Sequence, residues 1–130
     1  MIKIIALLKK KEGLSREEFI DHYENSHAPL INGYFQKFLV EYRRIYLDHD
    51  HELSFCGNYV DRHFSGQRYD AVTINSFRNA ADLEEFYQAA AQPGVGEAIA
   101  ADEAKFLDNS ANQVVVVLEE RVDRGGRALD

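Results

Sequence analysis

The chain has 130 residues, of which 45% are hydrophobic and 28% charged, which is typical of one globular domain with a single core. Its formal net charge of −7 and its dispersed basic residues argue against nucleic acid as a partner, because such binding needs clustered Lys and Arg. The apolar run at residues 4–8 is too short for a membrane span or a secretion signal, and the single cysteine, Cys56, allows no internal disulfide, so we expect a cytoplasmic protein without a membrane partner.

The N-terminal segment predicts a strand followed by a capped helix. Residues 2–9 form an apolar run that is typical of a strand. Ser15 and Glu18 have the spacing of a capping box, in which each side chain bonds the backbone N–H of the other residue. The helix should therefore begin at Ser15.

This helix carries a histidine at the end of its apolar face. Phe19, Tyr23 and His27 recur every four residues and fall on one side of the predicted helix. That side must point toward the core or toward a pocket. We expect the helix to end near His27, because the residue before Pro29 avoids the helical conformation.

The remaining chain alternates strand and helix signals. Residues 39–47 and 69–77 are rich in β-branched and aromatic residues and predict strands. Between them, residues 48–67 form a long polar stretch without a predicted element, which is uncommon unless it is functional or mobile. Three further features complete the pattern: a helix capped by Asn79 and ended by Pro93 and Gly94, a helical stretch from Val95 to Phe106, and a strand at residues 113–118.

The resulting order, βαββααβ, predicts an α+β fold of the ferredoxin-like type, in which a four-stranded antiparallel sheet carries helices on one face. Residues 2–9 and 113–118 are apolar at both odd and even positions. A sheet covered on one side only should alternate apolar and polar residues, so a second cover is required. The chain has no spare element for it. We therefore expect a homodimer with sheet packed against sheet.

With this architecture, two stretches resemble the EthD domain family: LSREEFIDHYENSHAPL at residues 14–30 and ADLEEFYQAAAQPGVGEAIAADEAKFLD at residues 81–108. The opening MIKIIALLKKKEG and the strand YDAVTINSF also fit. The resemblance indicates one domain at residues 1–120, followed by a tail at residues 121–130. It implies a dimeric α+β barrel related to small polyketide cyclases, muconolactone isomerases, cofactor-independent monooxygenases and fungal polyketide decarboxylases, and it does not select one reaction.

His27 is the strongest catalytic candidate, because imidazole exchanges protons near neutral pH. It also matches the histidine of the family motif HAPL. The alternative is a histidine that satisfies the last carbonyls of its helix. Tyr42 is the second catalytic candidate, because it resembles a tyrosine that is common on this strand in related barrels.

Tyr42, Arg44 and Tyr46 share one face of their predicted strand. Two phenols and a guanidinium can bind an aromatic or carbonyl substrate, with Arg44 stabilising an enolate or carboxylate. The alternative is an edge strand whose long side chains reach into solvent. For Arg44 we prefer that alternative.

Asp102 borders the apolar face of the last predicted helix and resembles a recurrent acidic position of the family. It can orient His27 or a substrate hydroxyl, although a purely structural pairing is the preferred reading. Aromatic residues at helical and strand spacing are expected in the core, which in this fold opens into the ligand cavity. These residues are Phe19, Tyr23, Phe77, Tyr87 and Phe106, of which Phe19, Tyr23 and Phe106 are also expected to contact substrate.

The polar stretch contains His49, His51 and His63, which offer a weak signal for a transition metal. We prefer a solvated loop and expect neither a metal nor a cofactor.

Two functions remain open. The first is a cofactor-free enzyme of cyclase, isomerase, dehydratase or decarboxylase type that transfers protons on an aromatic or polyketide-like metabolite. The second is a non-catalytic dimeric binding or accessory protein for a hydrophobic metabolite. An oxidoreductase of monooxygenase type is a further alternative that rests on the resemblance alone.

Overall fold

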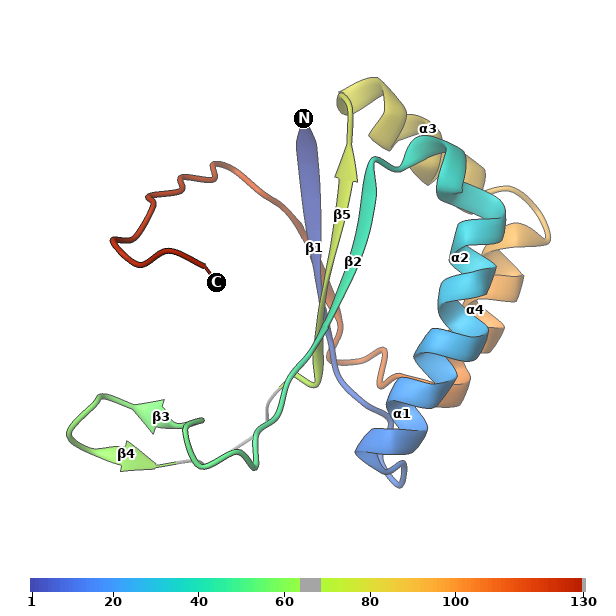
Figure 1. The fold of residues 1–130 in the computed structure, drawn as a ribbon. Coiled ribbons are helices and arrows are strands. Elements are labelled where there is room, and N and C mark those ends of the chain that lie inside the picture. Colours follow the sequence, from blue (N-terminus) through green and yellow to red (C-terminus); the bar gives the residue numbers. More distant parts are fainter. Residues whose placement is uncertain (64–68, 130) are drawn as a thin grey trace.

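A computed structural model describes residues 1–63 and 69–129, and its body is a sheet with helices on one face (Figure 1). The four strands are antiparallel and lie in the order β2-β5-β1-β6. This arrangement confirms the predicted α+β class and the four-stranded antiparallel sheet. The main elements are β1 (Ile2–Leu8), α1 (Arg16–His22), α2 (Ala28–Phe35), β2 (Glu41–Tyr46), β5 (Ala71–Phe77), α3 (Ala80–Ala90), α4 (Val95–Phe106) and β6 (Gln113–Val116).

The first helix begins as predicted but does not end where predicted. The capping box of Ser15 and Glu18 is present, with both bonds at 3.0 Å. Beyond α1 the chain continues through a π-helical turn, Tyr23–His27, directly into α2. The expectation that Pro29 ends the helix was wrong. Pro29 instead lies in the first turn of α2, where a missing N–H is tolerated.

The π turn explains how one helical face stays buried over so long a segment. Buried side chains recur at every fourth position, at Phe19, Tyr23, His27, Ile31 and Phe35. In a regular α-helix each step of four residues turns about 40° too far, so the series would rotate away from the sheet. A π turn holds more residues per turn and corrects this drift. His27 therefore stays on the face that points toward the sheet.

Residues 48–63 contain a short hairpin that the sequence did not predict. Its strands are β3 (Cys56–Gly57) and β4 (Arg62–His63). Gly57 has a φ of +88°, and a Cβ there would lie 2.6 Å from the backbone oxygen of Asp61, so the turn requires glycine. The hairpin extends away from the helices (Figure 1), and residues 64–67 of the predicted polar stretch lie outside the described residues.

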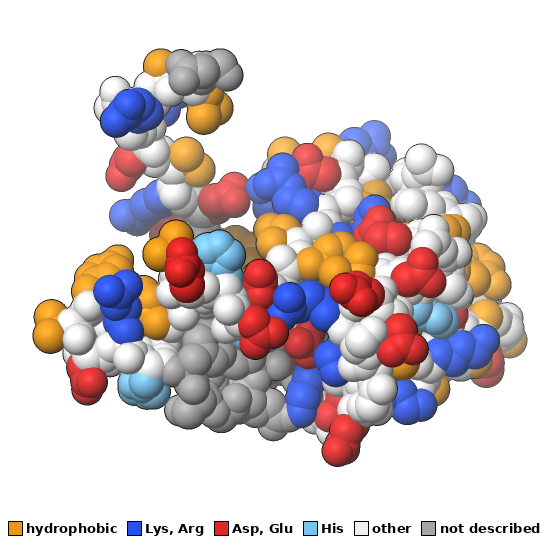
Figure 2. Space-filling view, turned by 60° about the horizontal axis from the view of Figure 1, so that its bottom comes forward, with side chains coloured by type: hydrophobic (Ala, Val, Ile, Leu, Met, Phe, Trp, Pro, Cys, Tyr) orange, Lys and Arg blue, Asp and Glu red, His pale blue; other side chains and the backbone are white. Residues whose placement is uncertain are grey.

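The sheet has two apolar faces, as the sequence indicated. The face toward the helices carries buried side chains such as Ile4 and Phe77. On the opposite face, Ile5 pairs with Ile74 and Val115. Val115 is 52% exposed, and among the described residues the side away from the helices holds the segment with the β3–β4 hairpin and the C-terminal tail, with no helix (Figure 1). The tail stands clear of the body (Figure 2), so this second apolar face is open in the single chain.

The capping box gives the first prediction. Replacing Ser15 with Ala should lower the free energy of unfolding by about 1 kcal/mol, because the N–H of Glu18 loses its acceptor. Ser15→Asp should keep most of this free energy, since a carboxylate also accepts at the N-cap position. Urea denaturation of both variants measures the difference, and equal stability of Ser15→Ala and wild type would contradict the role of the cap.

Candidate functional site

A cavity of about 240 Å³ lies between the helices and the sheet. It separates two halves of the hydrophobic core, one centred on Phe106 and one on Phe86, and Tyr42 contacts both halves. Among the lining residues, His27 and Tyr23 are buried, whereas Tyr87 and Val114 are 46% and 57% exposed and mark the mouth. The other lining residues are Ile4, Ala6, Leu8, Ile31, Phe35, Tyr42, Thr73, Asn75, Phe86, Ala90, Ile99, Glu103 and Leu107.

His27 is held on the cavity wall by a carboxylate from α4. Its Nδ1 lies 2.9 Å from Asp102 Oδ2. Two further side chains converge on the other oxygen of Asp102: Ser26 Oγ at 2.8 Å and His22 Nε2 at 3.0 Å. One buried carboxylate thus joins α4 to both ends of the π turn. His27 Nε2 has no hydrogen-bond partner in the described part of the chain.

The charges at this cluster determine the state of the imidazole. Burial raises the pKa of Asp102, but hydrogen bonds from Ser26, His27 and His22 outweigh it, so its pKa is lowered and it is a carboxylate at neutral pH. Burial lowers the pKa of His27 more than Asp102 raises it, so the ring is neutral. A carboxylate can only accept, so Nδ1 of His27 carries the proton. Nε2 is then the basic nitrogen.

Hydroxyl groups form the floor of the cavity. Tyr42 OH donates to Tyr23 OH at 3.2 Å, and Tyr23 OH lies 2.7 Å from Thr73 Oγ1. Burial is the main cause that raises the pKa of both tyrosines above the ordinary value. Both phenols therefore keep their protons and do not act as bases. The Tyr42 proton is used in the bond to Tyr23, so Tyr42 can donate to a ligand oxygen only if this bond is exchanged.

Arg44 and Tyr46 lie on the same face of β2 as Tyr42, as predicted, but they do not line the cavity. Arg44 forms a bidentate ion pair with Glu24, with N···O distances of 2.6 and 2.8 Å. Tyr46 OH also donates a hydrogen bond to Glu24. The guanidinium is thus already paired with a carboxylate. It stabilises the junction of β2 with the π turn.

The predicted aromatic residues divide into two groups. Phe19 and Phe106 are fully buried and do not line the cavity, and the Phe106 ring lies against the His27 ring at a centroid distance of 5.0 Å and an interplanar angle of 52°. Tyr23 lines the cavity. The expectation that Tyr87 belongs to the core was wrong, because its ring lies at the mouth, on the margin of the buried face of α3.

Sequence reasoning missed five polar residues near the site. Thr73, Asn75 and Glu103 line the cavity, and burial raises the pKa of Glu103. His22 and Ser26 reach Asp102 from a distance of 80 and 76 residues along the chain. The sequence offered one signal for His22 and Ser26, which is their place on the predicted helix close to His27.

The histidines of the polar stretch do not converge. His49 Nε2 contacts the carbonyl oxygen of Tyr69, and His51 Nδ1 accepts from the N–H of Leu53. In the described part of the chain, no group of three or more His, Cys, Asp or Glu side chains is arranged to hold a metal ion. Within the same residues, no helix has both the length and the apolar character to cross a membrane.

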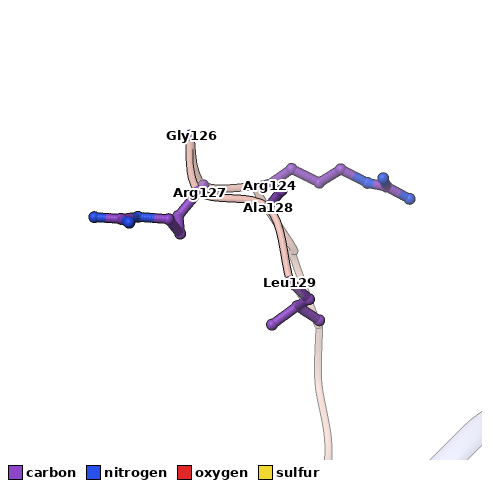
Figure 3. A pocket seen from close by; sticks show the side chains of 6 residues that line it. Arg124, Gly126, Arg127, Ala128 and Leu129 are labelled. Carbon is purple, nitrogen blue, oxygen red and sulfur yellow. The ribbon is translucent and has the colours of Figure 1, made fainter.

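A second hollow lies in the C-terminal tail and is lined by Arg124–Leu129. Figure 3 shows that the side chains of Arg124 and Arg127 extend in opposite directions. They do not converge on a common point, so this hollow offers no set of groups that would hold a ligand. The cavity beside His27 is the candidate site.

Comparison with known proteins gives a family and a fold. The model of the EthD domain matches residues 11–110. An EthD family protein from Bacillus halodurans has 21% identity and a TM-score of 0.59, covering 92% of this chain and 99% of its own. An EthD-like protein from Ralstonia eutropha has 19% identity and a TM-score of 0.56, covering 95% and 96%. A dimeric ferredoxin-like protein of unknown function from Jannaschia has 17% identity and a TM-score of 0.56, covering 89% and 96%. No curated protein matches the chain.

The lowered pKa of His27 gives a pH prediction. The unfolded chain protonates this histidine near its ordinary value of 6.5, and the folded chain only at lower pH. Between these values the unfolded state binds more protons, so the free energy of unfolding should fall as pH decreases below about 6.5.

NMR titration of the His27 ring should give a midpoint below 6.5, and His27→Gln should remove this part of the pH dependence. Asp102 acts in a separate window, because its stabilising effect is lost only below its ordinary pKa of 3.8. A His27 midpoint at or above 6.5 would contradict the assignment of Nε2 as a free base.

Proposed function

Because this chain belongs to the EthD family, we propose that it is a small enzyme that transfers protons on an aromatic or polyketide-like ligand, with His27 as acid and base and Tyr42 as its partner. The observation that supports this most is the His27–Asp102 pair on the cavity wall. Its 2.9 Å contact fixes the ring and leaves Nε2 as the basic nitrogen. A buried carboxylate that orients a histidine is a common arrangement for proton transfer.

The reaction follows from the protonation states. Nε2 of His27 takes a proton from an acidic carbon or hydroxyl of the ligand, and the imidazolium that forms is stabilised by Asp102. The electron pair moves onto a ligand oxygen, and the Tyr42 hydroxyl turns from Tyr23 to donate its hydrogen bond to this oxygen. The imidazolium then returns the proton at another ligand atom. No redox partner takes part, and cyclase, isomerase, dehydratase and decarboxylase chemistry each contain such steps.

The alternative is a non-catalytic binding protein for a small hydrophobic ligand. The mostly apolar lining supports it, because carbon-rich walls bind such a ligand without any chemistry. In that case the bond between His27 and Asp102 only holds α4 against the π turn. An oxidoreductase of monooxygenase type is supported by the family alone.

Exchange of carbon-bound protons separates the first two readings without knowledge of the substrate. Cyclohexanone in D₂O exchanges its α-protons when a base acts on it, and NMR follows the loss of the signal. Wild type should accelerate the exchange. His27→Ala should lower the accelerated rate by about 10²–10⁴ and change the melting temperature little, because one acid–base group contributes about this much.

His22→Ala is the matched control, because His22 contacts the same carboxylate at 3.0 Å but does not line the cavity. Its exchange rate should stay within about tenfold of wild type. If His27→Ala leaves the rate unchanged and mainly lowers the melting temperature, the binding-protein reading is correct.

We also propose that the chain forms a homodimer in which the open face of each sheet covers that of the other, as in a dimeric α+β barrel. The support is the apolar pairing on that face, where Ile5 meets Ile74 and Val72 meets Ile45. An apolar sheet face of this kind is rarely left in water. The dimeric ferredoxin-like protein from Jannaschia shares the fold.

Two substitutions of equal exposure test the dimer. Ile45 on the open face is 38% exposed, and Tyr34 on α2 is 37% exposed. Ile45→Glu should place a charge in the interface and shift the protein toward monomer, whereas Tyr34→Glu should leave the dimer intact. Sedimentation at micromolar concentration measures both. A monomeric wild type, or two variants with the same mass, would overturn the proposal.

A further inference from the structure

Asn75 presents an amide to the cavity without any partner. It lies on β5 opposite Tyr42, and its Oδ1 is buried and accepts no hydrogen bond. No other fully buried side-chain nitrogen or oxygen in the described part of the chain is left unpaired. An unpaired buried acceptor destabilises a fold, and native proteins keep such groups mainly where they serve a function. The missing partner is therefore sought in a ligand.

A hydroxyl group fits this position best. An amide both accepts and donates, and a hydroxyl is the smallest group that can meet both ends. Asn75 and Thr73 lie two residues apart on one face of β5, which is about 7 Å. Thr73 holds the hydroxyl pair of Tyr23 and Tyr42. The cavity thus has two polar positions on the same face of the sheet, the Asn75 amide and the hydroxyls of Tyr23 and Tyr42.

The volume suits a ligand with one ring. A cavity of about 150 Å³ holds benzene, and a water-sized group occupies about 30 Å³. The cavity of about 240 Å³ is therefore large enough for one aromatic ring with small substituents. A larger ligand would extend through the mouth toward solvent.

The charges disfavour an anionic ligand. No Lys or Arg lines the cavity among the described residues, and the guanidinium of Arg44, which lies against the Tyr42 ring, is paired with Glu24. Glu103 adds a carboxyl group to the lining. A ligand carboxylate would lose its water without gaining a cation, which is unfavourable in a largely apolar cavity.

From these observations we infer that the cavity selects an uncharged single-ring compound with two hydroxyl groups, one of which bonds Asn75 while the other bonds the Tyr23–Tyr42 pair. This inference rests on the proposed function, because both place the ligand in the same cavity. It adds Asn75 as the residue that determines specificity. His27 lines the same cavity, so its ring borders the bound compound.

The test compares resorcinol with 3-methylphenol, which differ only by a methyl group in place of the second hydroxyl. NMR titration gives both dissociation constants. Wild type should bind resorcinol about tenfold more tightly, because one hydrogen bond to an otherwise unpaired amide is gained. Asn75→Leu, close in size, should abolish this preference. Thr73→Val is the control and should weaken both compounds alike, since both keep the first hydroxyl.

The outcomes separate this inference from the proposed function. If wild type binds both compounds equally, or if Asn75→Leu keeps the preference, the role of Asn75 is refuted while the cavity stands as the site. If neither compound binds, the selection of a dihydroxylated ring is refuted, whereas the proposed function is judged separately by the exchange of the cyclohexanone protons. Tighter binding of 3-hydroxybenzoate than of resorcinol would refute the selection against charge. Thermal unfolding of Asn75→Leu verifies that the variant is folded.

Discussion

The carboxylate of Asp102 is the constraint on which the site depends. It is buried, it is ionised, and its oxygens receive three side chains of the helical segment that faces it. A buried charge with fewer donors would destabilise the fold, so α4 and the π turn must keep one relative position. That position sets the orientation of His27, and the choice of tautomer follows from it. The same carboxylate thus stabilises the fold and fixes the orientation and the tautomer of His27.

The π turn is the local structure that makes this possible. A regular helix through Tyr23 would rotate His27 away from α4, and a helix that ended before Pro29 would leave Ile31 without its place in the core. The wider turn satisfies both demands, because it absorbs the drift of a four-residue repeat. Irregular helical turns of this type are frequent at functional sites.

The sequence predicted those features that depend on residues close together along the chain. The capping box, the strands of the sheet, the apolar face with His27 and the shared face of Tyr42 and Arg44 are of this kind. Local rules failed at Pro29, because a repeat spanning four turns outweighed the preference of one residue. They could not find the bonds of His22 and Ser26 to Asp102, since these join residues 76 or more apart. A single polar residue inside a strand, such as Asn75, forms no pattern from which its place at the cavity could be predicted.

The cavity connects these findings with the energetics of the fold. It is lined by residues of both clusters of core residues, with Tyr42 as a shared neighbour. A cavity in a core forfeits dispersion contacts, and the unpaired amide of Asn75 adds a second cost. Both costs fall at one place. If the proposed hydroxylated ring binds there, it offsets both, so its binding should raise the free energy of unfolding.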